Sequence, residues 1–326
     1  MFAMGFVAVL ILGIAAVKGG EDGYLYTCIA ALTVCYALVF ILREYLLALG
    51  YPAMGVFAAE TVPFAFACAT IWLFQPSQVE TAVLLFMLGN VLSIAIQTPK
   101  VIRHLRTVLL KGEAKYETRA WSRVAGFALL GFGGRTALDR LDIIVLSTLA
   151  PAAELAYYNS GQRIANLLIL VPVVLLQVFS PYLSRAFAAG NIAQLRRDMV
   201  LQTFLIAACV LPLAALLVIF PEQIIVFLFG KAYQEASSGL LDLIVFSQVM
   251  FAFSLPWSNL MLMTDGERIY GYAHIAIIII VLPIAFGFVG SLGAIAVASA
   301  ASAANSLLFA VFVGFGVKRI VSGEHR

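Results

Sequence analysis

The sequence predicts an all-α integral membrane protein, with about ten transmembrane helices in two lobes of four and six helices. Hydrophobic residues make up 63% of the 326 residues, charged residues only 11%, and the mean hydropathy is +1.02. Soluble domains carry roughly 25% charged residues, so an aqueous fold could not cover this much apolar surface. The apolar runs are too long and too uniform for the strands of a membrane barrel, whereas a helix satisfies its own backbone groups in lipid.

Ten apolar segments are long enough to cross a bilayer core roughly 30 Å thick, which needs about 20 helical residues. They cover approximately residues 2–17, 24–42, 54–74, 79–97, 124–149, 156–180, 199–220, 239–263, 271–289 and 291–317. The first segment lacks the basic start of a signal peptide, so we expect it to be retained as a helix. Five prolines inside segments predict kinked helices: Pro63, Pro172, Pro212, Pro256 and Pro283.

Basic residues gather on one side of the predicted topology. Seven lie between the fourth and fifth segments: Lys100, Arg103, Arg106, Lys111, Lys115, Arg119 and Arg123. Successive loops of a helical membrane protein lie on alternate sides of the membrane. Counting from this loop, further basic residues lie on the same side: Arg43, Arg185, Arg196, Arg197, Arg268, Lys318, Arg319 and Arg326. Only Lys18 and Lys231 lie on the other side. Because cytoplasmic loops are enriched in Lys and Arg, the pattern predicts that both termini are cytoplasmic.

The polar interval at 98–123 divides the chain. We expect an incomplete N-terminal lobe of four helices over 1–97, a six-helix C-terminal lobe over 124–320 and a cytoplasmic tail over 321–326. Within the interval, apolar residues alternate with basic ones at helical spacing, which is typical of an amphipathic helix on an anionic membrane surface. It serves either as a linker that lets two lobes rock or as a basic anchor of the topology.

Charged residues interrupt the apolar segments of the C-terminal lobe at Arg135, Asp139, Arg140, Asp142 and Arg163. At 100° per residue, Asp139 lies about 40° and Asp142 about 20° from Arg135 around the helix, whereas Arg140 projects about 140° away. On the next segment, Arg163 shares a stripe with Asn and Gln side chains. An Arg or Asp in hydrocarbon costs about 2.5 to 3.5 kcal/mol, so these charges need partners or water.

Two arrangements would offset this cost. In the first, Arg135 pairs with Asp139 along the helix and Arg163 pairs with Asp142 across helices, which holds the lobe together. In the second, the stripes border a water-filled cavity where Arg135, and after it Arg163, contacts an anionic substrate. The hypothesis favoured here is the second, with the carboxylates positioning an arginine without cancelling its charge.

Three stretches match a known family in chain order. These are "RLDIIVLSTLAPAAELAYYNSGQRIANLLILVPVVLLQVFSPYLSR" (140–185), "IFPEQIIVFLFGKAYQEASSGLLDLIVFSQV" (219–249) and "REYLLALGYPAMG" (43–55). The first resembles the seventh and eighth helices of polysaccharide flippases in the multidrug/oligosaccharidyl-lipid/polysaccharide (MOP) exporter superfamily. The second resembles that family's approach to its tenth helix, and the third the link between its fourth and fifth helices. With four helices in front, the first helix pair of the family has no counterpart.

The resemblance implies a MATE/MOP flippase-like fold, with two lobes in a V that open alternately to the two membrane faces. It implies a transporter, not an enzyme, that flips a polyprenyl-diphosphate-linked oligosaccharide across the bacterial cytoplasmic (inner) membrane. Such transport feeds O-antigen, lipopolysaccharide or exopolysaccharide synthesis, with membrane lipid and a polysaccharide polymerase or ligase as partners. The residues carried over as cavity residues are Arg135, Asp139, Arg140, Asp142 and Arg163.

Other functions remain open at this point. An acidic cavity would favour a drug or cation exporter of the same superfamily. A membrane polysaccharide ligase or polymerase would need catalytic groups in an outer loop, and the interval 221–238 offers few. A non-transporting remnant is the third alternative. Glu60 either couples transport to a proton or cation or is an inert carboxylate.

Cofactors and nucleic acid are not expected. The sequence contains no Gly-rich phosphate loop, metal-binding cluster or nucleophile triad. Its four cysteines all lie inside apolar runs, without the spacing of a disulfide framework or a metal site. We therefore expect no cofactor, no resident metal and no nucleic-acid partner.

Overall fold

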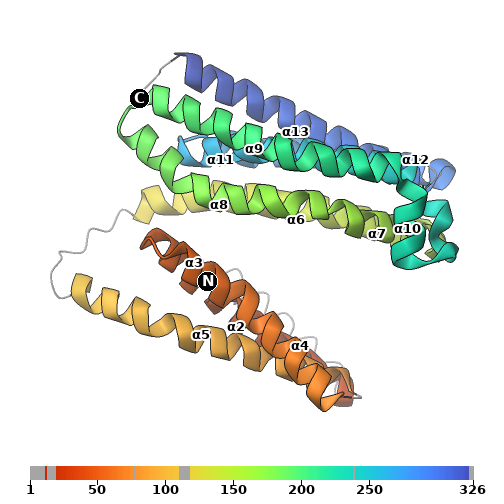
Figure 1. The fold of residues 1–326 in the computed structure, drawn as a ribbon, viewed down its shortest axis with the longest axis horizontal. Coiled ribbons are helices and arrows are strands. Elements are labelled where there is room, and N and C mark those ends of the chain that lie inside the picture. Colours follow the sequence, from red (N-terminus) through yellow and green to blue (C-terminus); the bar gives the residue numbers. More distant parts are fainter. Residues whose placement is uncertain (1–11, 13–19, 77, 110–117, 238, 323–326) are drawn as a thin grey trace. The chain divides into compact units, whose positions relative to one another are not determined.

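A computed structural model describes residues 12, 20–76, 78–109, 118–237 and 239–322 (Figure 1). Every regular element within these residues is a helix, and eight helical stretches are long and apolar enough to cross a membrane. The chain divides into two compact units, Met1–Tyr116 and Glu117–Arg326. The predicted first segment, 2–17, lies outside the described residues apart from Leu12.

In the N-terminal unit, α2 (Gly20–Ala48) and α4 (Val62–Phe74) both pack against α5 (Val79–Leu109). α4 continues directly from α3 (Pro52–Val56) through a π-helical turn (Phe57–Thr61). The apolar segment expected near α4 is therefore a single helical stretch with a wider turn inside it.

The wider turn has a local cause in Pro63. In this turn the Val62 N–H donates to the Phe57 carbonyl five residues back, and Pro63 has no N–H to donate in turn to the Ala58 carbonyl. Ser93 of α5 compensates, because its hydroxyl donates to the Ala58 carbonyl at 2.5 Å. Gly89 lets α5 approach closely, since a Cβ there would lie 2.8 Å from the Pro63 carbonyl oxygen. The kink predicted at Pro63 thus takes the form of a π turn.

Helices extend into the stretch 98–123 that the sequence assigned to a linker. α5 continues through Pro99 to Leu109, and α6 (Thr118–Leu149) begins ahead of the predicted boundary at 124. The amphipathic residues after Pro99 keep the same helical period as the membrane segment, so nothing in them ends the helix. Residues 110–117 lie outside the described part of the chain.

The C-terminal unit is built around one central helix, α11 (Leu240–Met263), most of whose residues are buried. The elements of the unit besides α6 and α11 are α7 (Ala152–Ala165), α8 (Leu167–Ala188), α9 (Ile192–Ile219), α10 (Pro221–Phe229), a 3-10 helix (Lys231–Ser237), α12 (Glu267–Leu292) and α13 (Ala294–Ser322). α13, α8, α9 and α7 all contact α11, while α6 packs mainly along α12. The long helices of this unit run side by side (Figure 1).

The segment predicted over 156–180 is divided between α7 and α8 at Asn166. The Asn166 N–H still donates to the Gln162 carbonyl at 2.9 Å, as in an α-helix. The Ile169 N–H, however, donates to the carbonyl of Asn166 itself, three residues back, at 3.1 Å. This tightened turn precedes Pro172, which cannot donate to the carbonyl four residues before it. The expected kink in this segment is therefore a short break between two helices.

Gly293 joins α12 to α13 with φ +55° and ψ −134°, beside a Glu154 carboxylate that accepts from the Ala294 N–H at 2.7 Å. A Cβ on Gly293 would collide with that carboxylate. Gly293→Ala is therefore expected to lower the free energy of unfolding by about 2 kcal/mol, because the clash adds to backbone strain. Thermal unfolding of the detergent-purified protein measures this. Gly290→Ala, whose added Cβ meets no atom within 4 Å, is the control, and equal midpoints would contradict the prediction.

Candidate functional site

The polar stripe predicted on α6 faces the interior of the C-terminal unit. Arg135, Asp139 and Asp142 all line a pocket bounded by α6, α7, α11, α12 and α13. Arg140 is exposed and lies outside this lining, as its angle around the helix predicts. Arg163 on α7 is also exposed and outside the lining. The structure thus brings together three of the five charged residues singled out in the sequence.

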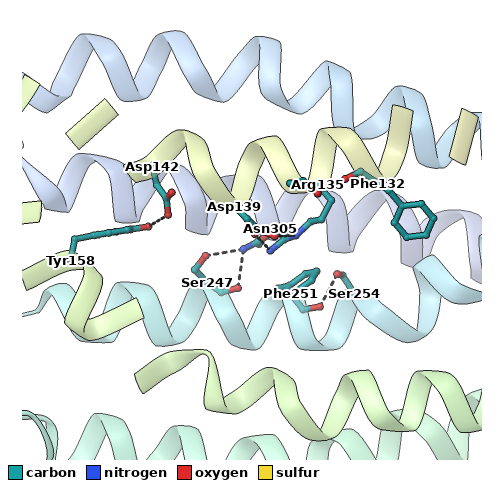
Figure 2. A network of polar contacts seen from close by, with 10 residues as sticks. Phe132, Arg135, Asp139, Asp142, Tyr158, Ser247, Phe251, Ser254 and Asn305 are labelled. Atoms are coloured by element: carbon teal, nitrogen blue, oxygen red, sulfur yellow. Dashed lines mark hydrogen bonds and ion pairs between the residues drawn. The ribbon is translucent and has the colours of Figure 1, made fainter. Parts of the chain in front are cut away.

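Three side chains, Asp139, Asn305 and Phe251, hold the guanidinium group of Arg135 (Figure 2). Its Nε donates to Asp139 Oδ2 at 3.1 Å, and its Nη2 pairs with Asp139 Oδ1. Its Nη1 donates to Asn305 Oδ1 at 2.6 Å, and its Cζ lies 3.4 Å from the centre of the Phe251 ring. The Arg135 side chain is only 12% exposed, whereas that of Asp139 is 43% exposed. The arginine is therefore fixed, and its carboxylate partner is the accessible half of the pair.

Asn305 links α13 to α11 behind this pair. Its Nδ2 donates to the Ser247 hydroxyl at 2.9 Å and to the Ser247 carbonyl at 3.2 Å. Its Oδ1 is thereby turned toward Arg135 (Figure 2). The one local signal for Asn305 is that it is an amide at the end of a stretch, 294–305, made mostly of alanine and serine. Nothing local indicated which charge that amide would meet.

Asp142 has a different partner from the one considered in the sequence. Its Oδ2 accepts from the Tyr158 hydroxyl at 2.6 Å, and its Oδ1 accepts from the Ile143 N–H at 2.7 Å. Tyr158 is 1% exposed and Asp142 8% exposed. Arg163, the partner considered earlier, lies about 140° from Tyr158 around α7 and points elsewhere. Of the first arrangement, the Arg135–Asp139 pair is present, whereas the Arg163–Asp142 pair is replaced by an Asp142–Tyr158 pair.

The pocket measures about 670 Å³ including the space at its open mouth. Its hydrogen-bonding lining consists of three charged and five uncharged side chains: Arg135, Asp139, Asp142, Tyr158, Gln162, Ser247, Gln248 and Asn305. The remaining lining is aliphatic, from alanine, leucine, isoleucine and valine. With one cationic and two carboxylate residues, the pocket carries a formal charge of −1. It offers charged and neutral hydrogen-bonding groups on an otherwise apolar wall.

Glu60 lies in the other unit, within the π turn. Its side chain is 48% exposed, and its Oε1 lies 3.2 Å from Nη1 of the buried Arg43. This ion pair fits the sequence interpretation of a carboxylate paired within its own helix bundle. No group of three His, Cys, Asp or Glu side chains in the described ranges is placed to hold a metal ion.

The fold and the site together define a class of protein: a multi-pass membrane protein whose helices enclose a partly charged pocket. The MatE family model matches residues 135–287, which include most of that pocket. No curated protein matches the chain significantly in sequence.

Solved structures with the same fold are MATE transporters. A MATE in the bent conformation has a TM-score of 0.81 at 15% identity, covering 98% of this chain and 75% of that one. An outward-facing multidrug resistance MATE family transporter of the MOP superfamily has a TM-score of 0.78 at 16% identity, with 99% and 76% covered. The Vibrio cholerae MATE transporter VcmN in the bent form has a TM-score of 0.75 at 12% identity, with 99% and 77% covered.

These similarities confirm the predicted all-α membrane fold, which is that of MATE transporters. The MatE match over residues 135–287 and the structures of MOP-superfamily transporters are similarities in the direction that the resemblance in the sequence implies.

Proposed function

We propose that the chain translocates a polyprenyl-diphosphate-linked oligosaccharide across a bacterial cytoplasmic membrane for cell-surface polysaccharide synthesis. The observation that best supports this function is the polar wall of the pocket, which combines one arginine with five uncharged hydrogen-bonding side chains. Sugar hydroxyls need neutral donors and acceptors, and a diphosphate needs a cation with a fork of N–H donors. The stretches 140–185 and 219–249, which resemble polysaccharide flippases, support the same substrate class.

Arg135 is suited to a diphosphate by the way it is held. Phe251 and Asn305 keep the guanidinium in one place, while the more exposed Asp139 occupies the face that presents two N–H donors. A phosphate group offers the same two-oxygen geometry as this carboxylate, so it can replace Asp139 without moving the arginine. The polyprenyl tail meanwhile stays in lipid. The pocket therefore handles only the parts of the substrate that cannot cross hydrocarbon.

A second candidate is export of an organic cation. The formal charge of −1 on the pocket lining favours it, since the charge of Arg135 is already balanced by Asp139 and Asp142 adds a further carboxylate. The multidrug resistance transporter among the similar solved structures is consistent with such a substrate. The buried arginine argues against this candidate, because a cation site gains nothing from a fixed positive charge.

The test is a transport assay on the full chain in proteoliposomes that contain a fluorescent polyprenyl-diphosphate oligosaccharide. A membrane-impermeant sugar-binding lectin reports its arrival in the outer leaflet. Arg135→Ala is expected to slow this transport roughly tenfold to a hundredfold, because it removes charged hydrogen bonds to the diphosphate. Arg163→Ala is the matched control, since that arginine is exposed and outside the pocket lining. Its rate should stay near that of the wild type.

Two results would reject the proposal. One is an unchanged rate in Arg135→Ala with correct insertion. The other is a wild-type protein that moves no lipid-linked sugar but exports ethidium, which would establish the second candidate. The topology with both termini in the cytoplasm, and a polymerase or ligase as partner, remain predictions from the distribution of basic residues and from the resemblance.

A further inference from the structure

The C-terminal end of α5 carries basic side chains that the pocket does not use. α5 continues as one helix through Pro99 to Leu109, so these side chains extend a membrane-crossing helix and do not lie on a separate surface helix. α5 begins at Val79, and a bilayer core takes about 20 helical residues to cross. Lys100 and Arg103 therefore stand where the hydrocarbon ends, at the level of the lipid phosphates.

Two tyrosines, from the end of α2 and the turn that follows it, border this part of α5. Lys100 Nζ lies 4.2 Å from the centre of the Tyr51 ring. The rings of Tyr45 and His104 meet edge to face, with their centres 6.2 Å apart. Lys100, Arg103 and His104 lie within about 100° of one another around α5. They therefore share one face of the helix, beside the two tyrosines.

The charges of Lys100 and Arg103 have no carboxylate partner in the described ranges. Glu44 on α2 lies 3.8 Å from Nε of Arg43. Both Lys100 and Arg103 are exposed. The ring of Tyr51 attracts the ammonium group of Lys100 but does not neutralise its charge. The N–H donors of the two cations are therefore open to an anion from outside the protein.

Exposed apolar side chains continue this face of α5 toward the membrane interior. Leu92 is 41% and Ile96 39% exposed. Ile96 lies about one turn before Lys100, Leu92 lies about two turns before it, and both are within about 20° of Arg103 around the helix. A ligand held by the cations would thus extend over apolar side chains. A phospholipid has this build, with a phosphate at the surface and acyl chains below it, whereas free phosphate would contact only the cations.

We propose that Lys100 and Arg103 bind the headgroup of one anionic phospholipid at the predicted cytoplasmic surface, with the two tyrosines beside it. Lysine and arginine donate charge-assisted hydrogen bonds to phosphate oxygens, and arginine presents a fork that binds two of them. Tyrosine adds a neutral O–H donor and is typical of membrane interfaces. The bound lipid holds the end of α2 against α5. The site belongs to the N-terminal unit and is independent of the substrate proposed for the pocket.

Binding of radiolabelled phosphatidylglycerol to the purified full chain in detergent, measured by scintillation proximity at constant ionic strength, tests this site. Unlabelled phosphatidylglycerol should compete about tenfold more effectively than phosphatidylcholine with the same acyl chains, because only the former has a net negative charge. Lys100→Gln and Arg103→Gln should each raise the half-saturating lipid concentration about fivefold. Both substitutions are at exposed positions, and the competition on the wild type needs no variant.

A second double variant separates a defined site from general attraction to the membrane surface. Arg196→Gln with Arg197→Gln removes two exposed charges from α9 on the same predicted side of the membrane. It should keep the affinity within about twofold of the wild type, whereas Lys100→Gln with Arg103→Gln should weaken binding about 25-fold.

Three results would overturn the proposal. One is an equal loss of affinity in the two double variants, which would mean that any basic residue at the surface attracts the lipid. Another is equal competition by phosphatidylcholine and phosphatidylglycerol. The third is displacement of the lipid by millimolar inorganic phosphate at the same ionic strength, which would assign a soluble anion to the site. None of these results depends on which substrate is transported.

Discussion

Asp139→Asn is expected to lower the free energy of unfolding of the C-terminal unit by about 3 kcal/mol. The substitution leaves the guanidinium of Arg135, 12% exposed, without its countercharge inside a membrane helix bundle. Breaking one half of a buried ion pair costs about 3 to 5 kcal/mol, and the partial exposure of Asp139 places this case at the lower end. Asn305 and Phe251 hold the arginine but supply no negative charge.

A double-mutant cycle measures the effect. Arg135→Gln combined with Asp139→Asn removes both charges, and its stability should return to within about 1 kcal/mol of the wild type. Asp265→Asn is the control, because Asp265 is 81% exposed and lies 3.9 Å from Arg319. That exposed pair should contribute less than about 1 kcal/mol. Equal losses in Asp139→Asn and Asp265→Asn would mean that the Arg135 pair is solvated like a surface contact.

Gly134→Leu is expected to be similarly damaging, for a steric reason. A Cβ on Gly134 would lie 2.8 Å from the Cβ of His274, and His274 is buried on α12. Gly131 on α6 is similarly close to the ring of Tyr270. Small residues therefore let α6 and α12 approach closely. Leucine would force the helices apart, and overpacking at such a contact costs about 3 kcal/mol.

Gly133→Leu on the same helix is the matched control. A Cβ on Gly133 meets no atom within 4 Å, and leucine is a better helix former than glycine. Its thermal midpoint should therefore equal or exceed that of the wild type, while Gly134→Leu unfolds at a lower temperature. Similar midpoints for the two variants would show that α6 and α12 are not held by this contact.

Several helices were predictable because their signal is local. The segments expected over 239–263 and 271–289 correspond to α11 and α12 within a few residues. The position of a membrane helix follows from the hydropathy and the length of its segment, and neither property depends on which helices become neighbours. The breaks were less predictable. The turn at Asn166 and the π turn ahead of Pro63 depend on which hydrogen bonds neighbouring groups can supply.

The sequence predicted the charged residues of the candidate site on α6, but not their partners on other helices. Arg135, Asp139 and Asp142 lie on one face of α6 by helical geometry alone, and all three line the pocket. Their partners were not predictable, because Asn305 and Tyr158 come from other helices and give no periodic signal of their own. Arg163 was expected to line the same cavity, but it lies outside the pocket lining. The rotation of α7 turns Tyr158 inward and Arg163 outward.

The sequence by itself determined that this chain is a helical membrane protein, where most of its helices run and that α6 carries a charged stripe. These properties follow from composition and from the fixed geometry of a helix. Only the tertiary structure decided that Asp139 balances Arg135, that Tyr158 binds Asp142, and that Gln202 is buried without a partner. The reason is that the environment of a buried charge depends on the rotation and packing of distant helices, which no local pattern encodes.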